Sequence, residues 1–263
     1  MNPATIGAIA AAIGVPIAFA ILGKFFPPSN IDPNGPSLEV LRQRFKNREM
    51  AISLGYIVMC VPIGLTLWYG FRGLSAWHAS LLPTAPIVLT AMSIYWALPA
   101  MFLSMVCADL PMTAILKRML GDEYADFHRY QALKYQMNPE RVSRVLMTGV
   151  GALCGIAVLL GLNWYVVVTE REFVVNRFLS LTEERYAISS IETIRTAPTL
   201  IAPNGNVVSR REYVVRFSGG ARWSTSDSPA DLDEDAKASL MQRLSGSSGV
   251  AIEEVDVFER GEW

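Results

Sequence analysis

The sequence predicts an α+β membrane protein, in which four transmembrane helices precede a small antiparallel β-barrel or sheet domain that one helix closes. Three observations predict this class. Four long stretches carry no charge in their interiors. After Val168 the spacing of apolar residues changes from helical to alternating. Residues 1–168 carry a net charge of +4 and residues 169–263 a net charge of −5, so two regions with different surroundings are expected.

Each uncharged stretch approaches the roughly 20 residues that a helix needs to cross the hydrocarbon core of a bilayer. The first has no basic residue ahead of its apolar core, so we interpret it as a retained membrane helix and not as a signal peptide. A buried bundle of soluble helices is the alternative, but four uncharged runs of this length exceed what a core requires. The predicted spans are Pro3–Phe26, Met50–Phe71, Thr84–Ala108 and Val145–Val168.

Basic residues beside the spans predict the orientation. They gather in the first and third loops, whereas the second loop holds only Arg72. Positive charge is retained on the cytoplasmic side, so the first and third loops are expected in the cytoplasm and the C-terminal domain outside it. The two basic clusters are Arg42, Arg44, Lys46 and Arg48 in the first loop, and Lys117, Arg118, Arg129, Lys134, Arg141 and Arg144 in the third.

The third loop also contains apolar and aromatic side chains at helical spacing, which predicts cytoplasmic amphipathic helices within residues 109–144. Such helices could bind a partner, or they could pack against helix ends and lipid headgroups. We therefore divide the chain into a transmembrane region, residues 1–163, and a β domain, residues 164–263.

The β domain is predicted from short runs rich in β-branched and aromatic residues. The segments TER, PNGN and SGG supply turns between them, and the Asn-Gly pair suits a hairpin. SPADLDEDA resembles a helix start with acids in the first turn, and GSSG ends that helix. The residues expected in the core of the domain include Phe173, Val175, Ile191, Ile194, Val214 and Phe217.

The run YVVVTEREFVVNRFLSLTEERYAISSIETIRTAP resembles the first half of a bacterial pleckstrin-homology-like domain, and AKASLMQRLSGSSGV is similar to its closing helix. The shared features are a T-x-R turn between two strands and a later strand that leads to I-x-x-I. The resemblance implies a curved, mostly antiparallel barrel plugged by one helix, acting as a binding or assembly module in a multi-pass protein of the bacterial inner membrane. Such modules are usually cytoplasmic, whereas the basic loops predict an extracytoplasmic domain.

The sequence predicts no catalytic residue, no cofactor site and no metal site, so the protein is not expected to be an enzyme. Cys60, Cys107 and Cys154 fall within predicted spans and have no C-x-x-C spacing, which indicates apolar side chains. No P-loop or G-x-S-x-G motif occurs. Charges inside spans mark ion paths, but only Lys24 and Asp109 approach the spans, both near span ends.

Candidate contact residues lie in two places. Arg42, Arg44, Lys46 and Arg48 could rest on anionic lipid, although a topology signal alone explains them as well. In the last span, Gly151 and Gly155 form a G-x-x-x-G pattern, which allows close packing either within this chain or with a partner.

Two classes of function follow. In the first, the protein is a non-catalytic accessory or assembly subunit that binds partner proteins in an inner-membrane complex. Its partners are then membrane lipids and other membrane proteins, and not nucleic acid. In the alternative, the protein is a component of a membrane-embedded enzyme or transporter with a site between its helices. A stable stoichiometric partner would favour the first class, and activity of the isolated chain would favour the second.

Overall fold

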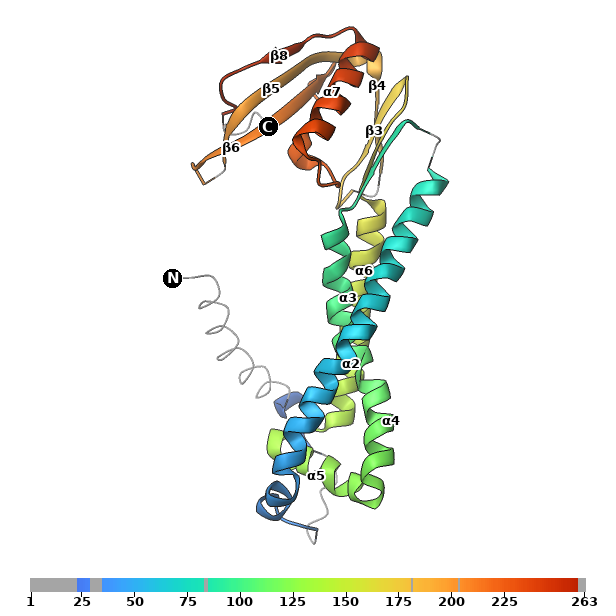
Figure 1. Ribbon diagram of the computed structural model, residues 1–263, viewed down its shortest axis with the longest axis vertical. Coiled ribbons are helices and arrows are strands. Elements are labelled where there is room, and N and C mark those ends of the chain that lie inside the picture. Colours follow the sequence, from blue (N-terminus) through green and yellow to red (C-terminus); the bar gives the residue numbers. More distant parts are fainter. Residues whose placement is uncertain (1–22, 29–34, 83–84, 181, 203, 260–263) are drawn as a thin grey trace. The chain divides into compact units, whose positions relative to one another are not determined.

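The computed structural model describes residues 23–28, 35–82, 85–180, 182–202 and 204–259. They belong to two compact units (Figure 1). The helical unit falls within residues 1–69 and 97–155, and the β unit falls within residues 70–96 and 156–263. Residues 3–22 of the first predicted span lie outside the described residues.

The bounds of the helices differ from those of the predicted spans, and α2 (Leu38–Leu81) extends beyond its predicted span at both ends. Within the described ranges, three helical stretches are long and apolar enough to cross a membrane: Leu38–Leu81, Ser93–Tyr135 and Pro139–Asn163. Residues 109–144, where the sequence predicts amphipathic helices, contain two complete helices, the 3-10 turn between them and the first residues of a third helix. The helical elements are α2 (Leu38–Leu81), α3 (Ser93–Cys107), α4 (Asp109–Leu120), the 3-10 turn η1 (Gly121–Glu123), α5 (Tyr124–Tyr135) and α6 (Pro139–Asn163).

The third and fourth predicted spans are wrong at one end each. The third begins with a strand, β1 (Ile87–Thr90), and helix α3 starts only at Ser93. The fourth ends early, because α6 stops at Asn163 and the next residues form strand β2 (Tyr165–Val168). The two misassigned segments pair with each other as antiparallel strands. Their β-branched residues suit a sheet, and this pairing satisfies backbone groups that a helix would otherwise have satisfied.

The β unit contains two four-stranded sheets and not the closed barrel that the family resemblance implies. The first sheet has the order β1-β2-β3-β4 and is antiparallel throughout. The second has the order β7-β6-β5-β8, in which β8 alone pairs in parallel. The remaining strands are β3 (Glu172–Asn176), β4 (Glu184–Ala187), β5 (Ile191–Ile201), β6 (Val207–Phe217), β7 (Arg222–Ser224) and β8 (Ile252–Glu254).

The main core of the β unit lies between the two sheets and helix α7 (Glu234–Ser248), which lies across strands of the β unit (Figure 1). All six predicted core residues are buried. Five of them belong to this core, whereas Val214 packs in a smaller cluster with Leu200 and Phe258. The helix begins at an Asp233 cap, whose side chain accepts the Ala236 N–H at 2.8 Å.

The opposite face of the first sheet is also covered, which explains why β2 reads as an unbroken apolar run. Tyr165, Val167 and Val174 pack there against Leu82 and Val88. A strand that is buried on both faces loses the alternation of apolar and polar residues. The residues that follow α2 therefore cover the sheet as well as extending it.

A polar cluster marks the joint between α6 and the first sheet. The Asn163 side chain donates to the carbonyl oxygen of Ser180 at 2.6 Å and accepts from the Asn176 amide at 2.8 Å. Nearby, the Tyr165 hydroxyl and the Arg185 guanidinium hydrogen-bond to Glu183 and hold the pKa of that carboxyl below its usual range. A single residue, Trp164, thus separates α6 from β2, and side-chain hydrogen bonds cross the joint.

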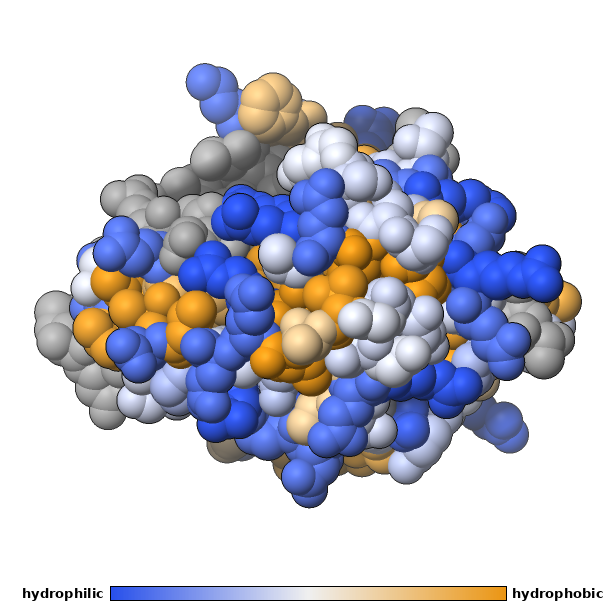
Figure 2. Space-filling view, turned by 90° about the horizontal axis from the view of Figure 1, so that it is seen from above, coloured by the Kyte–Doolittle hydropathy of each residue, from blue (hydrophilic) through white to orange (hydrophobic). Residues whose placement is uncertain are grey.

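Large apolar side chains remain exposed along the three long helices. The 18-residue apolar part of α2 has none of its residues buried within the protein. The face drawn in Figure 2, by contrast, carries hydrophilic residues around smaller patches of apolar ones. Exposed apolar residues of the helices include Leu54, Ile57, Val58, Val61 and Leu65 in α2, Ile94, Leu98 and Met105 in α3, and Val145, Leu153 and Leu159 in α6.

Candidate functional site

The helical unit contains a cavity with two adjoining chambers, which share Tyr56, Asp109, Gln131, Pro139 and Ser143 as lining residues. The apolar chamber has a volume of about 480 Å³ and the polar chamber about 380 Å³. Both volumes fall in the range of small-molecule sites. The apolar chamber is completed by Phe102, Met105, Val106, Tyr135, Met137, Val142, Leu146 and Val150, and the polar chamber includes Lys117, Tyr124, His128, Glu140 and Arg144.

Asp109, the first residue of α4, lies where the two chambers adjoin. The Tyr56 hydroxyl of α2 donates to its carboxylate at 2.7 Å, and the Ser143 hydroxyl of α6 donates to the other oxygen. Among the described residues no cation forms an ion pair with Asp109. A carboxylate can accept more than two hydrogen bonds, so this group can still bind a cation or a hydrogen-bond donor.

The polar chamber carries charges of both signs. His128 places Nε2 at 3.7 Å from a carboxylate oxygen of Glu140, and this shielded nitrogen has no hydrogen bond within the described part of the chain. The Lys117 ammonium lies 5.5 Å from the centre of the Tyr124 ring, at cation–π distance. Together with Arg144, these groups could hold a ligand that carries both a cation and an anion.

Glu49 of α2 fixes one wall of the cavity. Its carboxylate accepts hydrogen bonds from Tyr130 at 2.9 Å and Tyr135 at 3.2 Å, and it pairs with Lys134. Because Tyr135 also lines the apolar chamber, this cluster positions the end of α5 beside that chamber.

Two of the four predicted lipid-contact residues bind protein groups. Arg44 pairs with Asp126 at 2.6 Å, and Arg48 pairs with Glu123 of η1. These pairs are largely solvent-accessible, so each contributes at most about 1 kcal/mol to stability. Arg42 and Lys46 are exposed, and the lipid contact expected from the strip stays a prediction that rests mainly on them.

Gly151 and Gly155 present an open face of α6. A Cβ atom built at either glycine meets no atom of the described chain within 4 Å. Within the described residues, nothing packs closely against these two glycines, and their contact with a partner stays a prediction.

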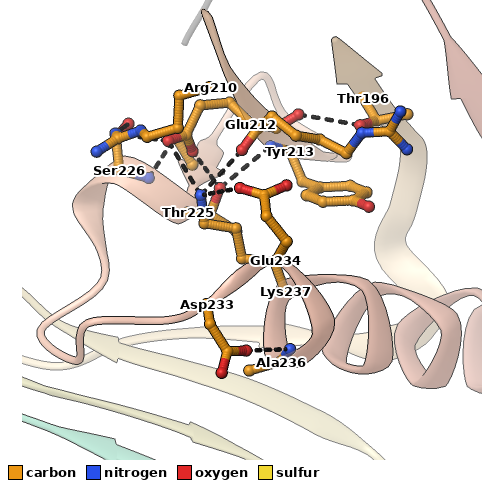
Figure 3. A network of polar contacts seen from close by, with 12 residues as sticks. Thr196, Arg210, Glu212, Tyr213, Thr225, Ser226, Asp233, Glu234, Ala236 and Lys237 are labelled. Atoms are coloured by element: carbon orange, nitrogen blue, oxygen red, sulfur yellow. Dashed lines mark hydrogen bonds and ion pairs between the residues drawn. The ribbon is translucent and has the colours of Figure 1, made fainter. Parts of the chain in front are cut away.

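Besides the polar centre around Asp109, a second polar centre, around Glu212, lies in the β unit (Figure 3). The Glu212 side chain is fully buried and accepts the Thr225 hydroxyl. Its other oxygen lies 2.5 Å from Arg210 and 3.5 Å from Lys237. Lys237 of α7 is itself 7% exposed, and its ammonium donates to the Arg211 carbonyl oxygen at 2.9 Å.

The contacts around Glu212 mainly join α7 to β6. Glu212 and Glu234 face Lys237, and Arg210 adds a second cation, so the buried charges are compensated. Charges that are buried in this way need such partners. The lining of an adjoining pocket of about 340 Å³ includes Arg210, Glu212, Glu234 and Lys237. Because these residues already pair with one another, the link between α7 and β6 explains their arrangement without a ligand.

Sequence reasoning did not identify either polar centre. It placed Asp109 only near a span end, and its partners Tyr56 and Ser143 come from other helices. The only local sign of the second centre is the spacing of Glu234 and Lys237, which puts them one turn apart on a helix.

Comparison of the chain with protein-family models, with curated proteins and with solved structures finds no match to any of the three.

Proposed function

We propose that this protein is integral to a bacterial inner membrane and acts there as a non-catalytic accessory or assembly subunit that binds partner proteins. The observation that carries the proposal is the pairing of β1 with β2. Strand β1 lies between α2 and α3, and β2 follows α6. Three helices that are long and apolar enough to span a membrane thus continue into one folded β unit. Because the β unit is joined to these helices, the molecules that it binds must come to the membrane surface.

The exposed apolar residues of α2, α3 and α6 support membrane insertion, because lipid would remove them from water. The resemblance to a bacterial pleckstrin-homology-like domain supports a binding role for the β unit. Because β1 and β2 share a sheet, the segment between α2 and α3 lies on the same side of the membrane as the C-terminal strands. The basic clusters, which include Arg42 and Lys46, favour the cytoplasm for the opposite side.

This orientation predicts which positions an impermeant thiol reagent reaches in intact spheroplasts. In a background without native cysteines, Ser218→Cys in the exposed turn after β6 should be labelled. Ser37→Cys, which is exposed just before α2, should be protected until the membrane is permeabilised. A reporter that requires export should be active when it is fused after Trp263. The reverse labelling pattern would place the β unit in the cytoplasm.

The assembly role predicts that Gly151→Leu combined with Gly155→Leu removes a stoichiometric partner during purification from native membranes in mild detergent. The thermal unfolding midpoint of the chain itself should change little, because a Cβ atom at either position meets no described atom within 4 Å. Gly161→Leu is the matched control. Its Cβ would lie 2.3 Å from the Tyr95 ring, so it should lower the midpoint of the chain directly. Unchanged copurification of the double variant would contradict a partner on this face.

A second candidate is the membrane-embedded enzyme or transporter component, which the position of Asp109 between two chambers favours. The same purification separates the two functions. An activity of the isolated chain that Asp109→Asn abolishes, with partner binding unchanged, would favour this second candidate. Asn keeps the size of the side chain and its ability to accept hydrogen bonds, but it removes the negative charge.

A further inference from the structure

The carboxylate of Asp109 is the charged group that the apolar and polar chambers share. The Tyr56 hydroxyl donates to one of its oxygens at 2.7 Å, and the Ser143 hydroxyl donates to the other. An ionised carboxylate only accepts hydrogen bonds, and it has about four acceptor positions. About two positions therefore remain for a hydrogen-bond donor that enters the cavity where the chambers adjoin.

The polar chamber offers partners for an anion. Lys117 and Arg144 line this chamber but not the apolar one, and within the described residues neither forms an ion pair with a carboxylate. The shielded Nε2 atom of His128 also has no hydrogen bond in that part of the chain, and in one tautomer it carries an N–H that can donate. Two cations and a free donor fit a phosphate group, whose oxygens accept several charge-assisted hydrogen bonds.

Glu140 adds a negative charge to the same chamber. One of its oxygens lies 3.7 Å from His128 Nε2, and its side chain is 71% exposed. Together with Asp109 it balances the two cations of the lining. A ligand with a phosphate alone would leave Glu140 without a partner, whereas a headgroup that also carries an ammonium would match it.

The apolar chamber suits a hydrocarbon chain. Apart from the residues that it shares with the polar chamber, its lining consists of apolar side chains and Tyr135, whose hydroxyl donates to Glu49 at 3.2 Å. Removal of a hydrocarbon chain from water into such a lining is favourable. The cavity thus presents, in order, an apolar lining, an acceptor at Asp109, and a pair of cations.

We propose that the cavity binds a single-chain phospholipid with a free glycerol hydroxyl, of the lysophosphatidylethanolamine class. The parts of this molecule follow the same order as the lining. Its acyl chain occupies the apolar chamber, and its hydroxyl donates to Asp109. Its phosphate pairs with Lys117 and Arg144, and its ammonium faces Glu140.

The free hydroxyl distinguishes this ligand from an ordinary diacyl phospholipid. In a diacyl lipid an ester replaces the hydroxyl, and ester oxygens accept hydrogen bonds but donate none. Such a lipid would place acceptors beside the acceptor positions of Asp109, which would then stay without a donor. An acceptor that is removed from water without a donor is costly, so the cavity should prefer the single-chain lipid.

The proposal goes beyond the accessory role and does not need a partner protein. Both ideas require helices that reach lipid, but they fail separately. Loss of the stoichiometric partner with lipid binding retained would count against the accessory role alone. A partner that copurifies with a chain that binds no such lipid would count against the ligand alone.

Native mass spectrometry of the full-length protein in detergent tests the proposal. The parent protein is incubated with an equimolar mixture of three ligands: palmitoyl lysophosphatidylethanolamine, dipalmitoyl phosphatidylethanolamine and monopalmitoylglycerol. The second lacks the free hydroxyl and the third lacks the phosphate. We expect one lysophospholipid per chain, at about ten times the occupancy of either competitor (about 1.4 kcal/mol of preference).

Variants assign each preference to its residues. Asp109→Asn should lower the preference over the diacyl lipid about tenfold, because the Asn side chain is uncharged and can itself donate to an ester oxygen. Lys117→Ala combined with Arg144→Ala should lower the preference over monopalmitoylglycerol to a similar extent. The matched control is Arg118→Ala combined with Arg141→Ala, which removes two exposed cations of the same two helices that do not line the cavity.

A third pair of variants tests the location of the chain. Val150→Trp places a large side chain in the lining of the apolar chamber and should reduce lysophospholipid binding about tenfold. Val145→Trp makes the same change at a position of α6 that is 46% exposed and outside the lining, and it should not reduce binding. Unchanged binding by Val150→Trp would place the lipid elsewhere and overturn the proposal.

The comparison of the three ligands uses the parent protein, so it does not depend on the folding of any variant. Equal occupancy by the lysophospholipid and the diacyl lipid would overturn the proposal, as would absence of any bound lysophospholipid. A preference that persists in Asp109→Asn would also overturn it, as would equal losses in the double variant of Lys117 and Arg144 and in its control. Each variant must first elute as a single species, like the parent protein.

Discussion

Phe217→Asp is expected to abolish the folded β unit. The Phe217 ring is fully buried, stacks on Tyr186 at 4.2 Å between ring centres and lies 5.5 Å from Phe173. Loss of a buried Phe ring costs about 3–5 kcal/mol, and a buried unpaired carboxylate adds several more. The sum is comparable with the whole stability of an ordinary domain, about 5–15 kcal/mol.

Limited proteolysis of the full chain in detergent measures this effect. The parent protein should yield a protease-resistant fragment that contains the β unit, and the Phe217→Asp variant should not. Val207→Asp is the control, because Val207 lies in the same strand but is 70% exposed. A fragment of equal resistance in both variants would show that the assignment of Phe217 to the core is wrong.

Glu212→Ala is expected to destabilise the β unit by about 3–5 kcal/mol, the usual loss when one partner of a buried ion pair is removed. The substitution leaves Lys237 buried, and in the described part of the chain its remaining carboxylate partner is the largely exposed Glu234 at 3.4 Å. Thermal or denaturant unfolding of the purified chain measures the loss. Glu254→Ala, which removes an exposed pair with Arg211, should change stability by no more than about 0.5 kcal/mol.

A double variant separates buried charge from lost packing. Glu212→Leu combined with Lys237→Met should recover most of the stability, because apolar residues of similar size can replace a buried ion pair at little cost. Arg210 is 53% exposed and can turn to water. If the double variant is no more stable than Glu212→Ala, the buried charge is not the cause of the loss.

Composition was sufficient to locate the long helices and the β-rich region, because an uncharged run of about 20 residues is typical of a membrane-spanning helix. It was not sufficient to find strand β1. The residues Ile87–Thr90 read IVLT, a short apolar run that periodicity alone cannot assign to strand or helix. Strand β2 was hidden in the same way at the end of a helix. Only their mutual pairing identifies both, and pairing between distant segments leaves no local signal.

The polar clusters around Asp109 and Glu212 could not be predicted from the sequence for a related reason. A single Asp109 near a helix start resembles many solvated helix ends, and its meaning comes from Tyr56 and Ser143, which reach it from other helices. Similarly, Glu212 lies in a strand whose first residues are all exposed, so its complete burial depends on α7 and on Thr225, which follows β7. The predicted core residues were correct because large apolar side chains in short strands usually pack against a second layer of the fold.

The pairing of β1 with β2 also sets an order of events during biosynthesis. The ribosome makes β1 early, but its partner strand emerges only after α3, α4, α5 and α6 have been made. In the membrane arrangement proposed above, β1 must wait as an unpaired edge until the last helix has been inserted. Sheet closure between such distant segments is slow, and an unpaired edge strand invites wrong partners. In that arrangement the first sheet can be completed only after α3 to α6 have been made, so folding of the β unit follows insertion of those helices.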